Sequence, residues 1–224
     1  MGLHCDSRQG HNAAGCSSCL VAHASRYGSA DAVTQVLERA SPAASASHCD
    51  ILRHRRCCGD TLVDEGTEIK DEHEVTQRAD LIPGAAEMVR ELKRRGYRLA
   101  LVADGPTGTF RNVLPAYGLW ELFDAFAISA EVGAEKPDAR IFHAAFQQLQ
   151  LLPEDYSRVL MVGNNLARDI KGANALGMVS VWLDWAPRRP KLPADDSEIP
   201  CHIIKEPLQL LSLLDSLEKK YAQD

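Results

Sequence analysis

The run Tyr97–Gly105 reads YRLALVADG and decides the fold class of the chain. Its apolar residues follow one another without alternation, which is typical of a strand buried on both faces, and the Asp-Gly pair then indicates a loop. A helix is predicted just before this run, because apolar residues recur at helical spacing between Ala85 and Leu92 and Gly96 is suited to end a helix. A buried strand next to an amphipathic helix is typical of an α/β sheet.

The same alternation of elements continues toward Leu217. Further strands are predicted at Ala125–Ser129, Val159–Val162, Val179–Leu183 and His202–Ile204. Further helices are predicted at Thr109–Tyr117, from Pro137 to Leu149, at Ala167–Leu176 and at Leu208–Leu217. Because alternating strands and helices form βαβ units, the sequence predicts a three-layer α/β sandwich with a Rossmann-like parallel sheet.

The first 58 residues differ in composition from the rest of the chain. They hold six of the seven cysteines and one aromatic residue, Tyr27. A segment with so little large apolar surface gains too little from burial to offset the entropy lost on ordering. We therefore expect residues 1–50 to be poorly ordered, apart from a short helix at Asp31–Ala40, and residues 51–224 to form the core domain.

The overall composition limits the classes of partner. The formal net charge is -6, so Lys and Arg are not in excess and a nucleic acid is not an expected partner. No apolar run is long enough to cross a bilayer or to form the apolar part of a signal peptide. Seven cysteines, an odd number, do not predict a disulfide framework. These observations favour a cytoplasmic protein without a membrane partner.

Polar residues stand at three places where the predicted strands and helices meet. Asp104-Gly105 closes the run quoted above, Lys136 precedes a helix, and Asn164 begins the loop after the strand at Val159–Val162. In parallel α/β sheets the loops at the carboxyl ends of the strands converge and form the active site. We therefore expect these residues to lie close together.

In order and spacing, three blocks resemble the second, third and fourth motifs of the haloacid dehalogenase (HAD) superfamily. They read LVADG at residues 101–105, EKPDARIF at 135–142 and GNNLARDIKGA at 163–173. The resemblance extends over about Leu81–Leu217. It implies a HAD-like core that hydrolyses a phosphorylated substrate with Mg²⁺, using an aspartate nucleophile at the end of the first strand.

The resemblance also implies roles for individual residues. It assigns Lys136 to neutralisation of the phosphoryl oxygens. It assigns Asp169 and Asn164 to the Mg²⁺ site, since carboxylate and amide oxygens suit a hard cation. Phosphate binding is assigned to Asp104, Gly105 and Thr107.

Two positions depart from the pattern of the family. Asn164 stands where the family has its first metal-binding acid, so a negative charge is lost and metal affinity is expected to fall. Ala103 stands where a Ser or Thr hydroxyl binds phosphate. Asp104 beside it is either a polar substitute or a turn-forming residue before glycine. The sequence therefore predicts a weakened site.

The first motif departs furthest. The run GDTLVD at residues 59–64 is similar to the tail of the nucleophile motif, which places Cys57 at the nucleophile position and adds Asp60 to the candidate catalytic residues. A buried strand should precede it, yet residues 53–56 are Arg, His, Arg and Arg, and burying them would carry a large desolvation penalty. A cysteine at position 57 also removes a carboxylate from the Mg²⁺ site.

Two functional interpretations remain open. The chain is a HAD-like phosphatase by descent whose activity is limited by Cys57, or it is a non-catalytic or decayed member that keeps the scaffold. We also hypothesise that the N-terminal region is a frame-shifted translation, because the codons of residues 48–56, read one nucleotide later, can encode an apolar strand ending in aspartate. A DNA sequence without such a frame would refute this.

The interval Leu62–Leu81 is too short for a helical cap domain.

Overall fold

The computed structural model describes residues 19–23, 32–35, 61–187 and 189–221. Its strands are β1 (Cys19–His23), β2 (Ala32–Gln35), β3 (Val63–Lys70), β4 (Thr76–Leu81), β5 (Tyr97–Ala103), β6 (Ala125–Ile128), β7 (Val159–Gly163), β8 (Val179–Leu183) and β9 (His202–Ile204). Its α-helices are α1 (Ala85–Arg94), α2 (Thr107–Ala116), α3 (Ser129–Val132), α4 (Ala139–Gln148), α5 (Lys171–Ala175) and α6 (Gln209–Tyr221). All the strands and helices predicted from residue 81 onward are found, with small shifts at their ends.

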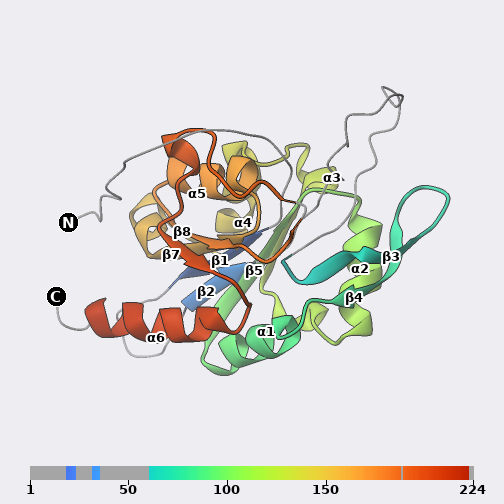
Figure 1. The fold of residues 1–224 in the computed structure, drawn as a ribbon, viewed down its shortest axis with the longest axis horizontal. Coiled ribbons are helices and arrows are strands. Elements are labelled where there is room, and N and C mark those ends of the chain that lie inside the picture. Colours follow the sequence, from blue (N-terminus) through green and yellow to red (C-terminus); the bar gives the residue numbers. More distant parts are fainter. Residues whose placement is uncertain (1–18, 24–31, 36–60, 188, 222–224) are drawn as a thin grey trace.

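One large sheet runs through the middle of the molecule (Figure 1). Its strand order is β2-β5-β1-β7-β8-β9, and β6 pairs with β5. The pairs β5–β6, β7–β8 and β8–β9 are parallel, as the alternation of strands and helices predicts. The predicted Rossmann-like parallel sheet is confirmed for these strands.

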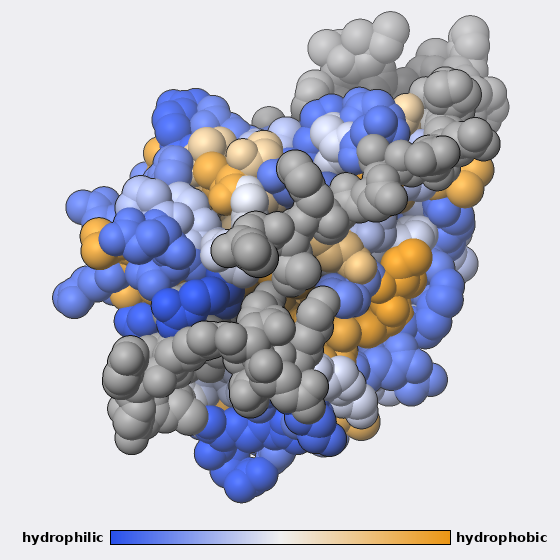
Figure 2. Space-filling model, turned by 90° about the vertical axis from the view of Figure 1, so that its left-hand side faces the viewer, coloured by the Kyte–Doolittle hydropathy of each residue, from blue (hydrophilic) through white to orange (hydrophobic). Residues whose placement is uncertain are grey.

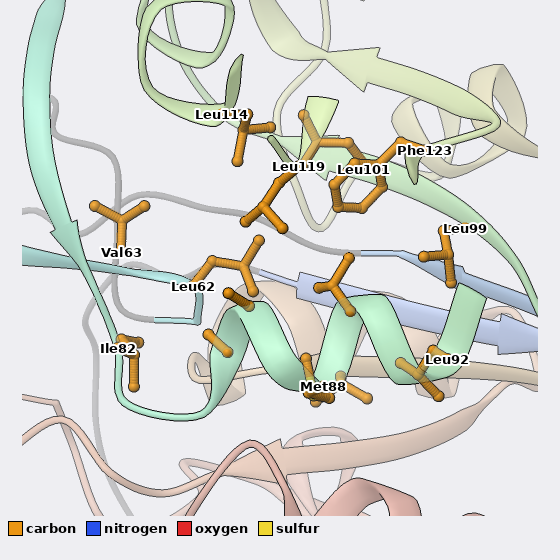
Figure 3. Packing of buried hydrophobic residues seen from close by; sticks show 14 of the residues in the cluster. Leu62, Val63, Ile82, Met88, Leu92, Leu99, Leu101, Leu114, Leu119 and Phe123 are labelled. Carbon is orange, nitrogen blue, oxygen red and sulfur yellow. The ribbon is translucent and has the colours of Figure 1, made fainter. Parts of the chain in front are cut away.

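Helices cover both faces of the sheet. Alternate residues of β5 point to opposite faces, so each face needs its own cover of apolar side chains. Leu99 and Leu101 belong to the core that α1 and α6 complete, whereas Ala100 and Val102 belong to the core that α4 and α5 complete. The first of these cores is shown in Figure 3, where Leu62 lies against the face of α1. The predicted three-layer arrangement is confirmed.

A hairpin of β3 and β4 occupies the interval where the sequence leaves no room for a helical cap. No helix occurs between Leu62 and Leu81, in agreement with that expectation. The hairpin is held to α2, since the Thr76 N–H donates to Thr109 Oγ1 at 3.0 Å and the Tyr117 hydroxyl donates to the Ala79 carbonyl at 2.7 Å.

The expected helix at Asp31–Ala40 is wrong in its described part, because Ala32–Gln35 forms strand β2. This segment pairs in parallel with the first half of β5, from Tyr97 to Ala100. Its β-branched Val33 and Thr34 fit a strand better than a helix. Backbone pairing with β5 therefore outweighs the weak helical spacing of three apolar residues.

The surface combines hydrophilic regions with smaller apolar ones (Figure 2). The large apolar side chains that are exposed come from separate elements and loops: Ile69, Leu152, Leu192, Ile203 and Leu208. Singly exposed residues of this kind are normal in globular proteins. Among the described residues, no helix is both long and apolar enough to span a membrane.

Candidate active site

Three loops bring the predicted polar residues together at the carboxyl ends of β5 and β7. Asp104 directly follows β5, Asn164 directly follows β7, and Lys136 lies in the loop before α4. All three side chains are buried. The expected convergence at this edge of the sheet is found.

Lys136 lies at the centre of this group and is 2% exposed. Its ammonium Nζ donates to the Val102 carbonyl at 3.0 Å, and it lies 3.8 Å from Asp104 Oδ2 and 3.7 Å from Asp169 Oδ1. A buried ammonium group requires compensating charge of this kind. Lys136 therefore joins the residues that follow β5 to those that follow β7.

The loop that carries Lys136 is fixed by its own sequence. The Lys136–Pro137 peptide bond is cis, and Asp138 then caps α4 by accepting the Arg140 N–H at 2.9 Å. Hydrogen bonds from the Arg140 side chain, and then from its backbone N–H, hold the pKa of Asp138 below its ordinary value. Asp138 therefore caps the N-terminus of α4, a position where the helix dipole favours an acidic side chain.

Asp104 turns its carboxylate inward, so its part in the site extends beyond forming a turn before glycine. Its Oδ1 accepts the backbone N–H of Lys136 at 3.0 Å, and its Oδ2 accepts from Arg168 Nη1, also at 3.0 Å. Gly105 has φ 151°, a backbone conformation that favours glycine, and its N–H donates to Ser129 Oγ at 2.7 Å.

Arg168 has no assigned role in the sequence-based prediction, although it belongs to the quoted run GNNLARDIKGA. Its Nη1 atom lies 3.0 Å from Asp104 Oδ2 and 3.4 Å from Glu135 Oε2, so it bridges two acids from different loops. Its backbone N–H is held by Asn165 Oδ1 at 3.1 Å. A basic residue inside a motif expected to be acidic is the feature that could have identified it.

Asp169 is fully buried in the π-helical turn Leu166–Ile170 that follows β7. Its Oδ2 accepts the Asn165 N–H at 2.9 Å, while its Oδ1 faces Lys136. The carbonyl of Asn164 accepts the Trp182 indole N–H at 3.1 Å, which ties this loop to β8. Of the two residues predicted for the metal, Asp169 therefore lies beside Lys136, and the backbone of Asn164 is bonded to Trp182.

Of the remaining predicted residues, the structure describes Thr107 but not Cys57 or Asp60. Thr107 begins α2 and is half-buried. Cys57 and Asp60 lie outside the described residues.

The lysine and acidic blocks also pack on each other, because a Cβ added to Gly172 would lie 2.5 Å from the Phe142 ring. Gly172 is therefore required for the close approach of α5 to α4.

The model of a protein family described as haloacid dehalogenase-like hydrolase matches residues 22–177 of this chain. The chain belongs to this HAD-like family. Two curated relatives illustrate the range of matches. A phosphoserine phosphatase of Thermus thermophilus is 38% identical over 108 residues, which are 48% of this chain and 42% of that protein. A glyceraldehyde 3-phosphate phosphatase of Methanopyrus kandleri is 31% identical over 137 residues, covering 61% and 58%.

Solved structures give the same family. A HAD phosphatase from Thermococcus onnurineus aligns with a TM-score of 0.51 and 28% identity, covering 61% of this chain and 59% of that one. The putative HAD-hydrolase YfnB from Bacillus subtilis, bound to magnesium, aligns with a TM-score of 0.53 and 26% identity, covering 60% and 56%. The chain spans about half the length of these curated relatives and solved structures.

The described part of the HAD-like site only partly fits a Mg²⁺ ion. Asp169 and Asn164 could each offer an oxygen, but the ammonium of Lys136 lies 3.7 Å from the Asp169 carboxylate and offsets its charge. Among the described residues, no group of three His, Cys, Asp or Glu side chains could hold a metal ion. Since Mg²⁺ is held mainly by carboxylates and water, a further acid from outside the described residues would be needed.

The strand between β5 and β7 has an unexpected direction for a HAD-like chain. In the family resemblance the nucleophile follows a parallel central strand. Here β1 fills that place and runs antiparallel to both neighbours, with Cys19 paired to Val102 and to Gly163. The amino end of β1, not its carboxyl end, therefore reaches the edge of the sheet where Lys136 lies.

Proposed function

We propose that this chain is a phosphoric ester hydrolase of the HAD-like family, acting on a phosphorylated substrate with Mg²⁺ as cofactor. The observation that supports it best is the burial of Lys136 between Asp104 and Asp169 at the carboxyl ends of β5 and β7. A fixed cation at this position would neutralise the oxygens of a phosphoryl group. The named phosphatases among the relatives support a phosphorylated substrate.

In this proposal Lys136, Asp169 and Asn164 have separate roles at the site. Lys136 binds a phosphoryl oxygen, Asp169 orients Lys136 through their 3.7 Å contact, and Asn164 and Asp169 offer oxygens to Mg²⁺. When bound, Mg²⁺ would neutralise phosphoryl charge as a Lewis acid. The nucleophile position, Cys57 in the family alignment, lies outside the described residues.

The location and partners follow from the composition. The net charge of -6 argues against a nucleic acid as the phosphorylated substrate, because cations for its phosphates are not in excess. The odd cysteine number without a disulfide framework favours the reducing cytoplasm.

A second candidate is a non-catalytic HAD-like protein, and the antiparallel direction of β1 favours it. A nucleophile at the carboxyl end of a central strand can reach Lys136 only if that end lies at the same edge of the sheet. Here the amino end of β1 lies at that edge, with Cys19 paired to Val102 and Gly163. Cysteine at position 57, where the family resemblance places the aspartate nucleophile, also favours the non-catalytic candidate. The scaffold would then bind its ligand without hydrolysing it.

Hydrolysis of p-nitrophenyl phosphate with and without Mg²⁺ tests the two candidates. The variants are Cys57→Asp, Lys136→Ala and, as a matched control, Lys171→Ala, which changes a half-buried lysine paired with Asp195. Mg²⁺-dependent turnover that survives in Lys171→Ala and is lost in Lys136→Ala supports the hydrolase. Turnover that appears with Cys57→Asp alone identifies a disabled hydrolase. No turnover in any variant supports the non-catalytic candidate.

A further inference from the structure

Two hydrogen-bond donors and one ammonium group surround the Asp104 carboxylate, as donors and cations surround a bound oxyanion. The Lys136 N–H and Arg168 Nη1 each lie 3.0 Å from a carboxylate oxygen, and Lys136 Nζ lies 3.8 Å from one. Asp104 is fully buried, so its carboxylate is shielded from water at this point. The next donor of the same loop, the Gly105 N–H, is directed to Ser129 Oγ at 2.7 Å.

We propose that Asp104 fills the anion subsite of this chain with its own carboxylate and so determines which ligands can enter it. Arg168 is the cation that neutralises this internal anion. The proposal rests on the proposed function to the extent that Lys136 is taken as the phosphate-binding lysine. It adds a specificity-determining residue whose effect on binding is separate from turnover.

The charges of the surrounding residues support this role. Ion pairs among the described residues join the cations Lys136 and Arg168 to the carboxylates of Asp104, Asp169 and Glu135. The group therefore carries one more negative than positive charge. A phosphate group that enters must displace Asp104 from its donors or lie beside it, and like charges repel strongly in a buried site.

Arg168 can pair either with the Asp104 carboxylate or with a phosphate that enters the site. The Arg168 side chain is 26% exposed, so its guanidinium can turn away from Asp104 toward solvent. A guanidinium forms paired hydrogen bonds with carboxylates and phosphates alike. Without the Asp104 charge, the cations of Lys136 and Arg168 would remain for an external oxyanion.

The test is calorimetric titration of the full chain with sodium orthophosphate at constant ionic strength. The variants are Asp104→Asn, which keeps the side-chain volume and an acceptor for the Lys136 N–H, and Asp104→Ser. Glu135→Gln is the matched control, because it removes another acidic charge that contacts Arg168 but leaves Asp104 in place. We expect orthophosphate to bind at least about tenfold more tightly to Asp104→Asn than to the wild type, and less than about threefold more tightly to Glu135→Gln.

Two results would overturn the proposal: wild-type affinity equal to that of Asp104→Asn, or an equal gain in Glu135→Gln. If neither Asp104 variant folds by circular dichroism, thermal unfolding of the wild type in phosphate or chloride decides. Stabilisation by phosphate means that the subsite is already open, against the proposal, and equal melting temperatures support it.

The binding result is distinguishable from failure of the proposed function. A chain without turnover whose Asp104→Asn variant gains phosphate affinity fails as a hydrolase and keeps the specificity role of Asp104. An active wild type whose Asp104→Asn variant gains no affinity keeps the hydrolase and loses this role.

Discussion

Strand β1 differs from its neighbours β5 and β7 in the interactions that determine its structure. β5 from Leu99 onward and β7 are continuous apolar runs whose side chains fill both cores of the sandwich. The place between them is occupied by β1, which lies in the region of the chain poorest in large apolar residues. Unpaired backbone groups of two buried strands are costly, and the apolar run CLVA at residues 19–22 can satisfy them in the antiparallel direction.

This difference separates two kinds of specification. β5 is determined by its own apolar sequence and by the helices on each side of it. β1 is determined mainly by the backbone hydrogen bonds that β5 and β7 can form with it. A strand fixed by its own apolar pattern should be sensitive to loss of side-chain volume. A strand fixed by backbone pairing should be sensitive to loss of an N–H.

The largest effect is expected for Leu101→Ala in β5. Leu101 is fully buried, so the substitution removes apolar contacts and leaves a cavity, and the free energy of unfolding should fall by about 3 kcal/mol. Urea denaturation measures it. Leu152→Ala, at a leucine that is 57% exposed, is the control and should change stability by less than about 0.5 kcal/mol. Equal effects of the two substitutions would contradict the described core.

A proline in β1 tests the other side of the comparison. Val21 pairs with Ala100 of β5 and Met161 of β7, so Val21→Pro removes a backbone N–H from the centre of the sheet. We expect a loss of about 2 kcal/mol in the free energy of unfolding, from one hydrogen bond and an acceptor left buried. Val21→Thr keeps the N–H and serves as the control. A proline variant as stable as this control would mean that β1 contributes little to the sheet.

A smaller effect is expected at the cap that positions the loop of Lys136. Asp138→Ala removes the acceptor of the Arg140 N–H and should lower the free energy of unfolding by about 1 kcal/mol. Asp138→Asn keeps a capping oxygen and should recover most of the loss. Thermal melts of the three proteins at neutral pH measure the difference, and an asparagine variant as unstable as the alanine variant would argue against the cap.

The smallest effect is a pH dependence on the surface of α1. Hydrogen bonds from Arg94, and then Arg95, lower the pKa of Glu91 from 4.5 to about 2. Because the folded-state pKa is depressed, the contribution of Glu91 is present above pH 4.5 and is lost as the pH falls toward about 2. The melting temperature of Glu91→Gln should therefore approach that of the wild type as the pH falls through this range. A constant difference between the two proteins would refute the assignment.

Much of the site could be predicted from sequence because its residues lie at the ends of periodic elements. Lys136 precedes a helix begun by Pro137-Asp138, and Asp169 follows a buried strand, so their positions at one edge of the sheet follow from the parallel topology. The role of Arg168 could not be predicted. It contacts Asp104, which is 64 residues away in the sequence, and such a pair depends on how two loops meet in space.

The sequence by itself determined the layers of this protein, the elements from Leu81 onward and its relationship to the HAD-like hydrolases. It could do so because periodic burial and the residues at the ends of strands are local properties. The tertiary structure alone decided the direction of β1, the hairpin of β3 and β4 and the pairing of Asp104 with Arg168. These features depend on backbone groups and charges that distant parts of the chain bring together, and their energies exist only once those parts meet.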